Sequence, residues 1–187
     1  VNTYGACKFI SERIFIESNF SKGRAKTIFT CVRYGNVLES TGSLIPSIIS
    51  KIKNNEEITL TDNQMTRFFI SSDQAVNLIF KALKHGVGGE IFIPKLECFK
   101  VEDVIEVLKE SYNCTKETKL AGIRPGEKIH ELMVNKQEAS RTFEFDDIFV
   151  ITSEIEKYQR DSKHLYLEGM PLVNFEEYNS KDYVISK

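Results

Sequence analysis

The sequence lacks long apolar runs and clusters of like charge. None of its apolar stretches approaches the length of a membrane-spanning helix, so we expect no membrane segment. The formal net charge is −2, and the 25 lysines and arginines are spread along the chain without forming a run. These features argue against a nucleic-acid partner and against binding to a membrane surface.

Cysteine and histidine are scarce as well. The four cysteines, Cys7, Cys31, Cys98 and Cys114, show no Cys-x-x-Cys spacing, and the three histidines lie far apart in the sequence. We therefore expect neither a metal site nor a disulfide framework, and we expect a reducing cytoplasm as the compartment.

Apolar periodicity predicts helices that alternate with strands. This alternation indicates an α/β fold with a mainly parallel sheet. The helices are expected at 3–19, 43–54, 72–83 and 101–112, and the strands at 27–34, 57–61, 68–70, 90–94, 142–145 and 148–152. The first helix should turn its apolar stripe toward a core, and the strand at 27–34 should be covered on both faces.

The segment 122–131 combines a turn, both signs of charge and an expected helix start. Pro125 and Gly126 should fix a turn that carries Arg124, and Glu127 and Glu131 should share one face of the helix that follows. A guanidinium fork fits phosphate oxygens, and a carboxylate accepts hydrogen bonds from ribose hydroxyls. The alternative is an exposed helix start stabilised by salt bridges.

Tyr4 and Lys8 are four residues apart on the first helix, which places phenol and ammonium on one face. A neighbouring cation favours the phenolate, so the pair could act as a general base although a free phenol has a pKa of about 10. The pairs at 112–116 and 183–187 have the same spacing. Only context distinguishes the three pairs: Tyr4 lies at the start of a helix that precedes a buried strand, whereas the other two lie at a helix end and in the tail.

Polar residues follow two of the expected strands. Asn36 lies just beyond the strand at 27–34, where ligands bind in open parallel sheets, and Gly35 would let a ligand approach the backbone. The alternative is a plain turn. Arg67 could reach a diphosphate from the next strand pair, close to Thr61, or it could form a surface ion pair with Asp62.

Six motifs occur in the order found in the extended short-chain dehydrogenase/reductases. They are Val-Asn-Thr-Tyr-Gly-Ala-Cys-Lys at 1–8, Arg-Tyr-Gly-Asn-Val at 33–37, Gly-Ser at 42–43, Met-Thr-Arg-Phe at 65–68, Gly-Gly-Glu-Ile-Phe-Ile-Pro-Lys at 88–95, and the segment 122–131. Within that superfamily the chain most resembles the inverting UDP-N-acetylglucosamine 4,6-dehydratases and related polysaccharide-biosynthesis proteins. The resemblance extends to about residue 152.

The resemblance implies an enzyme that binds NADP, oxidises C4 of a UDP-sugar, eliminates water across C5 and C6, and returns the hydride to C6. It also implies a homo-oligomer. Tyr4 would take the proton of the 4-hydroxyl group, Lys8 would bind the nicotinamide ribose and lower the pKa of Tyr4, and Val37 would line the cofactor. The UDP-sugar would be held by Asn36, Thr61, Arg67, Arg124 and Glu127, with Arg124 on the diphosphate and Glu127 on the uridine ribose.

The implied fold is the C-terminal part of a Rossmann-like doubly wound sheet interleaved with a smaller substrate-binding domain. Residues 1–40 and 71–96 would form the NADP-binding part, and residues 41–70 and 97–187 the substrate-binding part. The family's glycine-rich loop and its Asp-Lys pair for elimination lie upstream of the tyrosine motif. We therefore expect a fragment whose parent is the enzyme and which alone is inactive and prone to associate.

Two alternatives remain open from the sequence. A UDP-sugar epimerase of the same superfamily shares Tyr4 and Lys8, and a non-catalytic nucleotide-sugar binding module would keep the fold without the chemistry. Thr41 also departs from the family, which often has arginine there. The upstream sequence would separate the three possibilities, because only the dehydratase needs both the glycine-rich loop and the Asp-Lys pair.

Overall fold

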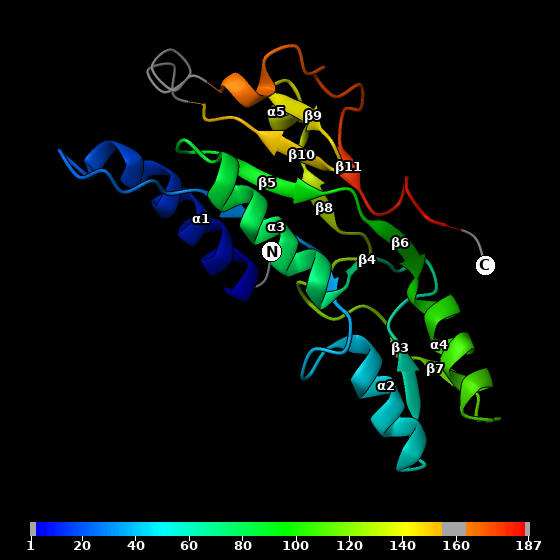
Figure 1. The fold of residues 1–187 in the computed structure, drawn as a ribbon. Helices are drawn as coiled ribbons and strands as arrows, with labels where there is room; N and C mark the ends of the chain where they lie inside the picture. Colours follow the sequence, from blue (N-terminus) through cyan, green and yellow to red (C-terminus); the bar gives the residue numbers. More distant parts are fainter. Residues whose placement is uncertain (1–2, 155–163, 186–187) are drawn as a thin grey trace. The chain divides into compact units, whose positions relative to one another are not determined.

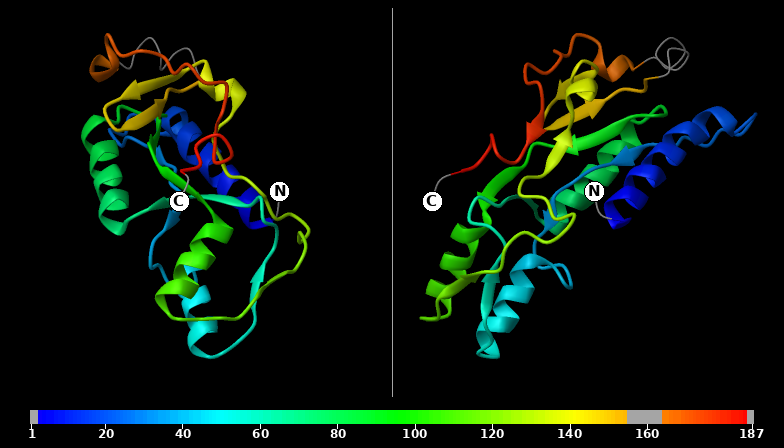
Figure 2. Two further views of the ribbon diagram at one scale, coloured as in Figure 1. Left: turned by 90° about the vertical axis from the view of Figure 1, so that its right-hand side faces the viewer. Right: turned by 180° about the vertical axis from the view of Figure 1, so that it is seen from behind.

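The computed structural model describes residues 3–154 and 164–185. The chain forms two compact units, drawn in Figures 1 and 2. Unit 1 comprises Val1–Arg33, Asp73–Lys95 and Met133–Tyr178, and unit 2 comprises Tyr34–Ser72, Leu96–Leu132 and Asn179–Lys187. The α/β class predicted from the sequence is confirmed.

Unit 1 is built on a four-stranded mixed sheet in the order β1-β5-β10-β9. Strand β1 runs parallel to β5, whereas β10 is antiparallel to both β5 and β9, so the expectation of a mainly parallel sheet is only partly met. The elements of this unit are α1 (Thr3–Ser21), β1 (Cys31–Val32), α3 (Ser72–His85), β5 (Ile91–Pro94), α5 (Lys136–Ala139), β9 (Thr142–Phe145), β10 (Ile148–Ile151) and the 3-10 helix η1 (Leu165–Leu167).

The core of unit 1 lies between α3 and the central strands. Strands β5 and β10 are buried along their whole length, as continuous apolar runs covered on both faces should be. Leu78 and Ala82 of α3 belong to the same apolar cluster as Phe92 and Val150, and Figure 1 shows α3 lying along β5. The apolar period predicts the helix but only part of its packing: Ala75, Leu78 and Ala82 are buried. The larger apolar residues of the predicted stripe, Val76, Ile79, Phe80 and Leu83, are 42–74% exposed.

The expected packing of α1 is wrong. Phe9 and Phe15 are 57% and 52% exposed, and Ile10 and Ile14 are similarly open, whereas the buried residues of α1 are Ile16 and Asn19. The strand expected at 27–34 is reduced to the two residues of β1, and Ile28 is 52% exposed. The physical reason is that no described element of unit 1 covers the apolar stripe of α1.

Polar contacts connect α1 to the rest of unit 1. The side chain of Asn19 donates to the carbonyls of Ile16 and Phe29 and accepts from the N–H of Phe29. Arg33, directly after β1, binds the carboxylate of Glu12 with two hydrogen bonds of 2.6 Å. It also donates two bonds of 2.7 and 2.9 Å to Glu138 in α5, and one of 2.7 Å to the carbonyl of Met133.

These contacts use all five N–H donors of the Arg33 guanidinium. Arg33 and Glu138 are 18% and 2% exposed, and Arg13 adds a further ion pair to Glu138 at 3.2 Å. Burial alone would raise the pKa of Glu138, but the hydrogen bonds and charge of Arg33 and the N–H of Asn135 hold it below its ordinary value. The carboxylate is therefore ionised and fully bonded at neutral pH.

Unit 2 contains two small sheets. In the sheet of order β2-β4-β6, β2 is parallel and β6 antiparallel to β4, and in the second sheet β3 is parallel to β7. The chain passes between the units within β8 (Leu132–Val134) and β11 (Tyr178–Asn179). The other elements are β2 (Asn36–Val37), α2 (Leu44–Lys53), β3 (Ile58–Leu60), β4 (Thr66–Ile70), β6 (Glu97–Lys100), α4 (Val101–Ser111) and β7 (Thr118–Leu120).

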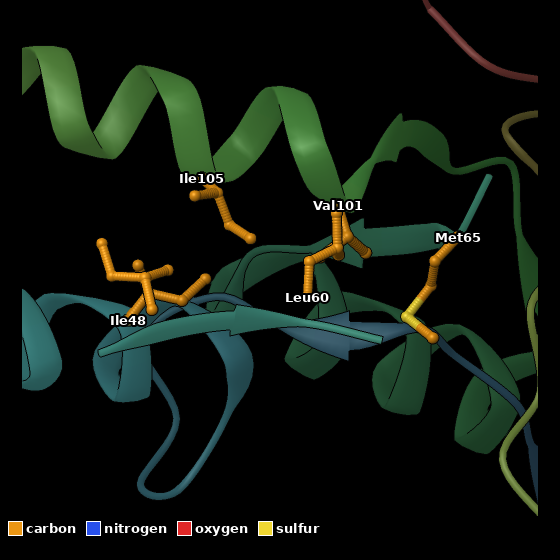
Figure 3. Close-up of a cluster of buried hydrophobic side chains, with 6 residues drawn as sticks. Ile48, Leu60, Met65, Val101 and Ile105 are labelled. Carbon is orange, nitrogen blue, oxygen red and sulfur yellow. The ribbon is translucent and has the colours of Figure 1, made fainter. Parts of the chain in front are cut away.

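The core of unit 2 is an apolar cluster from α2, α4, β3 and the turn before β4. Helices α2 and α4 pack together beside β3 (Figures 1 and 2). Ile48, Leu60, Met65, Val101 and Ile105 meet there, and Figure 3 shows their side chains turned toward one another. Ile58 is also fully buried in this cluster.

The ranges of the units differ from the predicted domains mainly at 133–178. We assigned these residues to the substrate-binding part, but they lie in unit 1 because β10 pairs with β5 from Ile148 opposite Pro94 to Ile151 opposite Ile91. The predicted roles of the two parts in binding cofactor and substrate stay predictions.

Replacing Arg33 tests the ion-pair cluster. Arg33→Ala leaves the carboxylates of Glu12 and Glu138 without their main partner, so we expect it to lower the free energy of unfolding by about 3–5 kcal/mol at pH 7. Arg33→Lys keeps the charge but cannot bridge two carboxylates with paired donors, so its loss should be smaller. Denaturant unfolding measures both, and Arg24→Ala at an exposed arginine is the matched control.

The same loss should depend on pH. Because the folded pKa of Glu138 lies below its ordinary value of 4.5, its contribution is present above that value and is lost as pH falls through the folded pKa. The stability gap between wild type and Arg33→Ala should therefore narrow as the pH falls from about 5 into the acid range below 4.5. A gap that stayed constant over this range would show that the cluster is not a source of stability through Glu138.

Candidate nucleotide-sugar site

The predicted site residues divide between the two units. Tyr4 and Lys8 belong to α1 in unit 1. The others lie in unit 2: Asn36, Val37, Thr61, Arg67, Arg124 and Glu127. Each set is described within its own unit.

Tyr4 and Lys8 share one face of α1, as their spacing predicts. The Nζ atom of Lys8 lies 5.4 Å from the centroid of the Tyr4 ring, which is the range of a cation–π contact. Tyr4 is 72% exposed and Lys8 is exposed too, so both groups are open to a ligand. Glu12 follows on the same face at the next i+4 position, and Arg33 anchors it.

Asn36 is placed by the pairing of β2 with β4. A Cβ atom at Gly35 would lie 2.4 Å from the carbonyl oxygen of Phe68, so glycine is needed there because β4 comes so close. Close packing against β4 is thus a sufficient reason for Gly35, and the approach of a ligand there stays a prediction. The Asn36 amide nitrogen donates to that carbonyl at 3.3 Å and to the carboxylate of Glu131 at 3.2 Å. Val37 continues β2 opposite Ile70 and is half-buried.

Glu131 is a hub for this part of unit 2. Its second oxygen accepts from the backbone N–H of Phe68 at 2.9 Å, and its first lies 3.8 Å from Nε of Arg67. Burial raises the pKa of Glu131 above its ordinary value, while the bonds from Phe68 and Asn36 and the charge of Arg67 act against that rise. Desolvation wins, so Glu131 should protonate more readily than an exposed glutamate.

The turn expected at 124–127 is confirmed, and the helix after it is wrong. The N–H of Glu127 donates to the carbonyl of Arg124 at 3.0 Å, and Gly126 takes a φ of 80°, as a turn with proline before glycine requires. Residues 127–131 form no helix because the Ile129 carbonyl accepts from the N–H of Thr66 in β4 at 3.0 Å. Residues 127–131 are therefore held against β4 by this backbone hydrogen bond instead of forming a helix.

Thr61 and Glu127 meet, although they are 66 residues apart. The Thr61 hydroxyl donates to a Glu127 oxygen at 3.1 Å, and the backbone N–H of Arg124 approaches the other oxygen at 3.4 Å. The guanidinium of Arg124 is exposed and forms no ion pair within the described residues. It is thus available for an anion beside a carboxylate whose position is fixed.

Arg67 does not form the alternative ion pair with Asp62. Its guanidinium donates to the carbonyls of Thr66, Lys128 and Ile129 at 2.7–2.9 Å, and its side chain is 15% exposed. These carbonyls carry no full charge, so Arg67 keeps a positive charge that only Glu131 approaches among the described residues. Its predicted contact with a diphosphate stays a prediction.

A buried chain of polar contacts that the sequence does not predict links Thr66, Ser180 and Glu131. The hydroxyls of Thr66 and Ser180 are 2.6 Å apart, Thr66 also contacts Nδ1 of His130 at 2.8 Å, and the Glu131 N–H donates to Ser180 at 2.8 Å. The thiol of Cys98 donates to the Ser180 carbonyl, and burial raises its pKa to about 11. No sequence signal could link residues 114 positions apart, as Thr66 and Ser180 are.

None of the described helices is both long enough and apolar enough to span a membrane.

The profile of a family described as polysaccharide biosynthesis protein matches residues 1–153. Among curated relatives, an uncharacterized membrane protein of Methanocaldococcus jannaschii is 42% identical over 158 residues, covering 81% of this chain and 47% of its own. The inverting UDP-N-acetylglucosamine 4,6-dehydratase of Campylobacter jejuni serotype O:2 is 36% identical over 163 residues, covering 87% of this chain and 48% of its own. This chain thus spans about half the length of both.

An epimerase and a solved structure are similar to this chain as well. A UDP-glucose 4-epimerase of Rickettsia rickettsii is 33% identical over 151 residues, covering 81% of this chain and 44% of its own. The X-ray structure of Pen from Bacillus thuringiensis superposes with a TM-score of 0.85 at 35% identity, over 99% of this chain and 54% of that one. The chain therefore belongs to the polysaccharide biosynthesis protein family, a branch of the extended short-chain dehydrogenase/reductases with a Rossmann-like α/β fold.

Proposed function

We propose that this chain is part of a nucleotide-sugar 4,6-dehydratase that acts on UDP-N-acetylglucosamine with NADP. The observation that carries the proposal is the exposed Tyr4 and Lys8 pair, with the ammonium over the phenol ring, in a chain similar to an inverting dehydratase along 87% of its length. A general base next to a cation is what oxidation of a sugar hydroxyl requires.

In this proposal Tyr4 takes the proton of the C4 hydroxyl group. The ammonium of Lys8 would stabilise the phenolate through its positive charge. Lys8 would also bind the hydroxyls of the nicotinamide ribose, since an exposed ammonium has three donors, and Val37 would line the cofactor. NADP, when bound, would supply the acceptor for the hydride of C4 and the donor of that hydride to C6. Elimination of water is assigned to no residue of this chain.

Unit 2 would bind the UDP-sugar. The free guanidinium of Arg124, on a turn made rigid by Pro125 and Gly126, suits the diphosphate, and Arg67 adds a second charge. Glu127, held by the hydroxyl of Thr61, suits the hydroxyls of the uridine ribose. The remaining residue, Asn36, would contact the neutral part of the ligand.

A UDP-sugar 4-epimerase is the second candidate. The identity of 33% to a UDP-glucose 4-epimerase favours it, and an epimerase would use Tyr4 and Lys8 for the same first oxidation. A non-catalytic binding module is the third, and the exposed Tyr4 and Lys8 pair argues against it. The two enzymes differ in their product, so incubation with UDP-N-acetylglucosamine separates them: a dehydratase releases a 4-keto-6-deoxy sugar nucleotide, and an epimerase releases the 4-epimer.

Nucleotide preference is the first test of the binding site. If Arg124 and Glu127 hold a uridine diphosphate, the complete gene product should bind UDP-N-acetylglucosamine at least about tenfold more tightly than ADP-glucose, equivalent to roughly 1.4 kcal/mol. Isothermal titration calorimetry measures both affinities under one buffer condition. Equal affinities for the two ligands would contradict a uridine site.

Two substitutions separate the contributions of charge and shape at Arg124. Arg124→Lys keeps the charge without the planar fork and Arg124→Ala removes both, so affinity for UDP-N-acetylglucosamine should fall in the order wild type, Lys, Ala. Calorimetry gives the order, and Arg24→Ala, at another exposed arginine, should bind as wild type. Arg124 would be merely structural if both of its variants bound like the wild type.

Tyr4→Phe tests the chemistry. Removing one exposed hydroxyl should leave folding and UDP-sugar affinity nearly unchanged, while turnover by the complete gene product falls by about 10²-fold or more. Tyr112→Phe is the matched control, because Tyr112 has the same spacing to a lysine and lies at the end of α4. Lys8→Met should also slow turnover, since the phenolate loses the cation that stabilises it. Wild-type turnover by Tyr4→Phe would end the catalytic assignment.

A further inference from the structure

The amide of Asn36 can have only one orientation in this structure. Its two protein partners, the carbonyl of Phe68 and the carboxylate of Glu131, are both hydrogen-bond acceptors. The amide nitrogen must therefore face them, at 3.3 and 3.2 Å. Turning the amide over would place its oxygen against two other oxygens. Among the described residues, the Asn36 oxygen has no hydrogen-bond partner.

The acceptor that fixes this orientation is itself fixed. The other oxygen of Glu131 accepts from the backbone N–H of Phe68 at 2.9 Å, and the Arg67 guanidinium lies 3.8 Å away with the opposite charge. Gly35 keeps β2 close to β4 because any side chain there would collide with Phe68. The amide of Asn36 is thus held by backbone pairing and by a carboxylate that cannot rotate freely.

We infer that Glu131 sets the hydrogen-bond polarity of Asn36, so that the ligand group bound there is a donor, a hydroxyl or an amide N–H, and not a phosphate oxygen. This rests on the proposed binding of a nucleotide-sugar by Asn36. A diphosphate at neutral pH offers only acceptors, so it cannot satisfy the Asn36 oxygen, and the charge of Glu131 nearby repels it further. Asn36 thus binds a neutral donor group of the ligand, and the two arginines, Arg67 and Arg124, bind the diphosphate.

The decisive comparison exchanges the carboxylate and the amide between positions 131 and 36. Glu131→Gln supplies an amide donor beside Asn36, so the Asn36 amide is no longer fixed, and affinity for UDP-N-acetylglucosamine should fall about 3- to 10-fold, the range of one net hydrogen bond. Adding Asn36→Asp to Glu131→Gln restores an acceptor for the ligand. This double variant has the same net charge as the wild type. The double variant should therefore bind more tightly than Glu131→Gln.

A phosphate contact predicts the reverse. A carboxylate at position 36 would repel the diphosphate, so the double variant would bind more weakly than Glu131→Gln. Equal or weaker binding by the double variant, or wild-type affinity in all variants, overturns the inference. Glu117→Gln, at an exposed glutamate of unit 2, controls for the loss of a charge and should bind as wild type.

Calorimetry on the complete gene product measures these affinities, and thermal melting checks that each variant is folded. If Glu131→Gln does not fold, wild-type NMR decides. UDP-N-acetylglucosamine should then shift the side-chain carbonyl carbon of Asn36 and leave the exchange protection of its amide protons unchanged, whereas a phosphate contact would shift those protons strongly. If the wild type fails to bind UDP-N-acetylglucosamine, the proposed function fails as well. If binding persists with the wrong order of variants, the inference fails alone.

Discussion

Unit 1 depends on the pairing of one guanidinium with two carboxylates. Helix α1 leaves much of its apolar stripe exposed, so Arg33 does what hydrophobic packing usually does and fixes the helix through Glu12. Glu138 closes the cluster from α5. A buried ion pair gains little over an apolar replacement, but losing one member is costly. The position of the Tyr4 and Lys8 face is therefore sensitive to Arg33, to which the proposed function gives no ligand contact.

The site residues of unit 2 follow a related principle. Their orientation comes from neighbours that satisfy one side of each polar group and leave the other side open. Thr61 fixes Glu127, and Glu131 fixes Asn36, so each side chain presents one defined chemical character. Preorganised polar groups of this kind bind without having to be ordered when the ligand arrives. Charge for the diphosphate and neutral hydrogen bonding for the sugar are thereby supplied by different residues.

Much of this could be predicted from local sequence pattern. The amphipathic period predicts α2, α3 and α4 to within a few residues, and the apolar runs predict β5 and β10. The short strands β2, β6 and β7 were not predicted, because they are stabilised by partners distant in sequence rather than by their own composition. The helix expected after Gly126 fails for the same reason, since backbone pairing with β4 outweighs local propensity. Spacing predicts the Tyr4 and Lys8 face but not its exposure, which depends on what covers α1.

The bond between Thr66 and Ser180 has a consequence for how the chain folds. It spans 114 residues, and Ser180 also bonds to the backbone of Glu131, so unit 2 is completed only by a segment near the end of this sequence. Unit 1 likewise needs β10 to pair with β5. Each unit is assembled from three separated stretches of chain, and the entropy of closing such long loops must be lost before the contacts form. On a ribosome, neither unit could reach its final packing until nearly all of these residues had emerged.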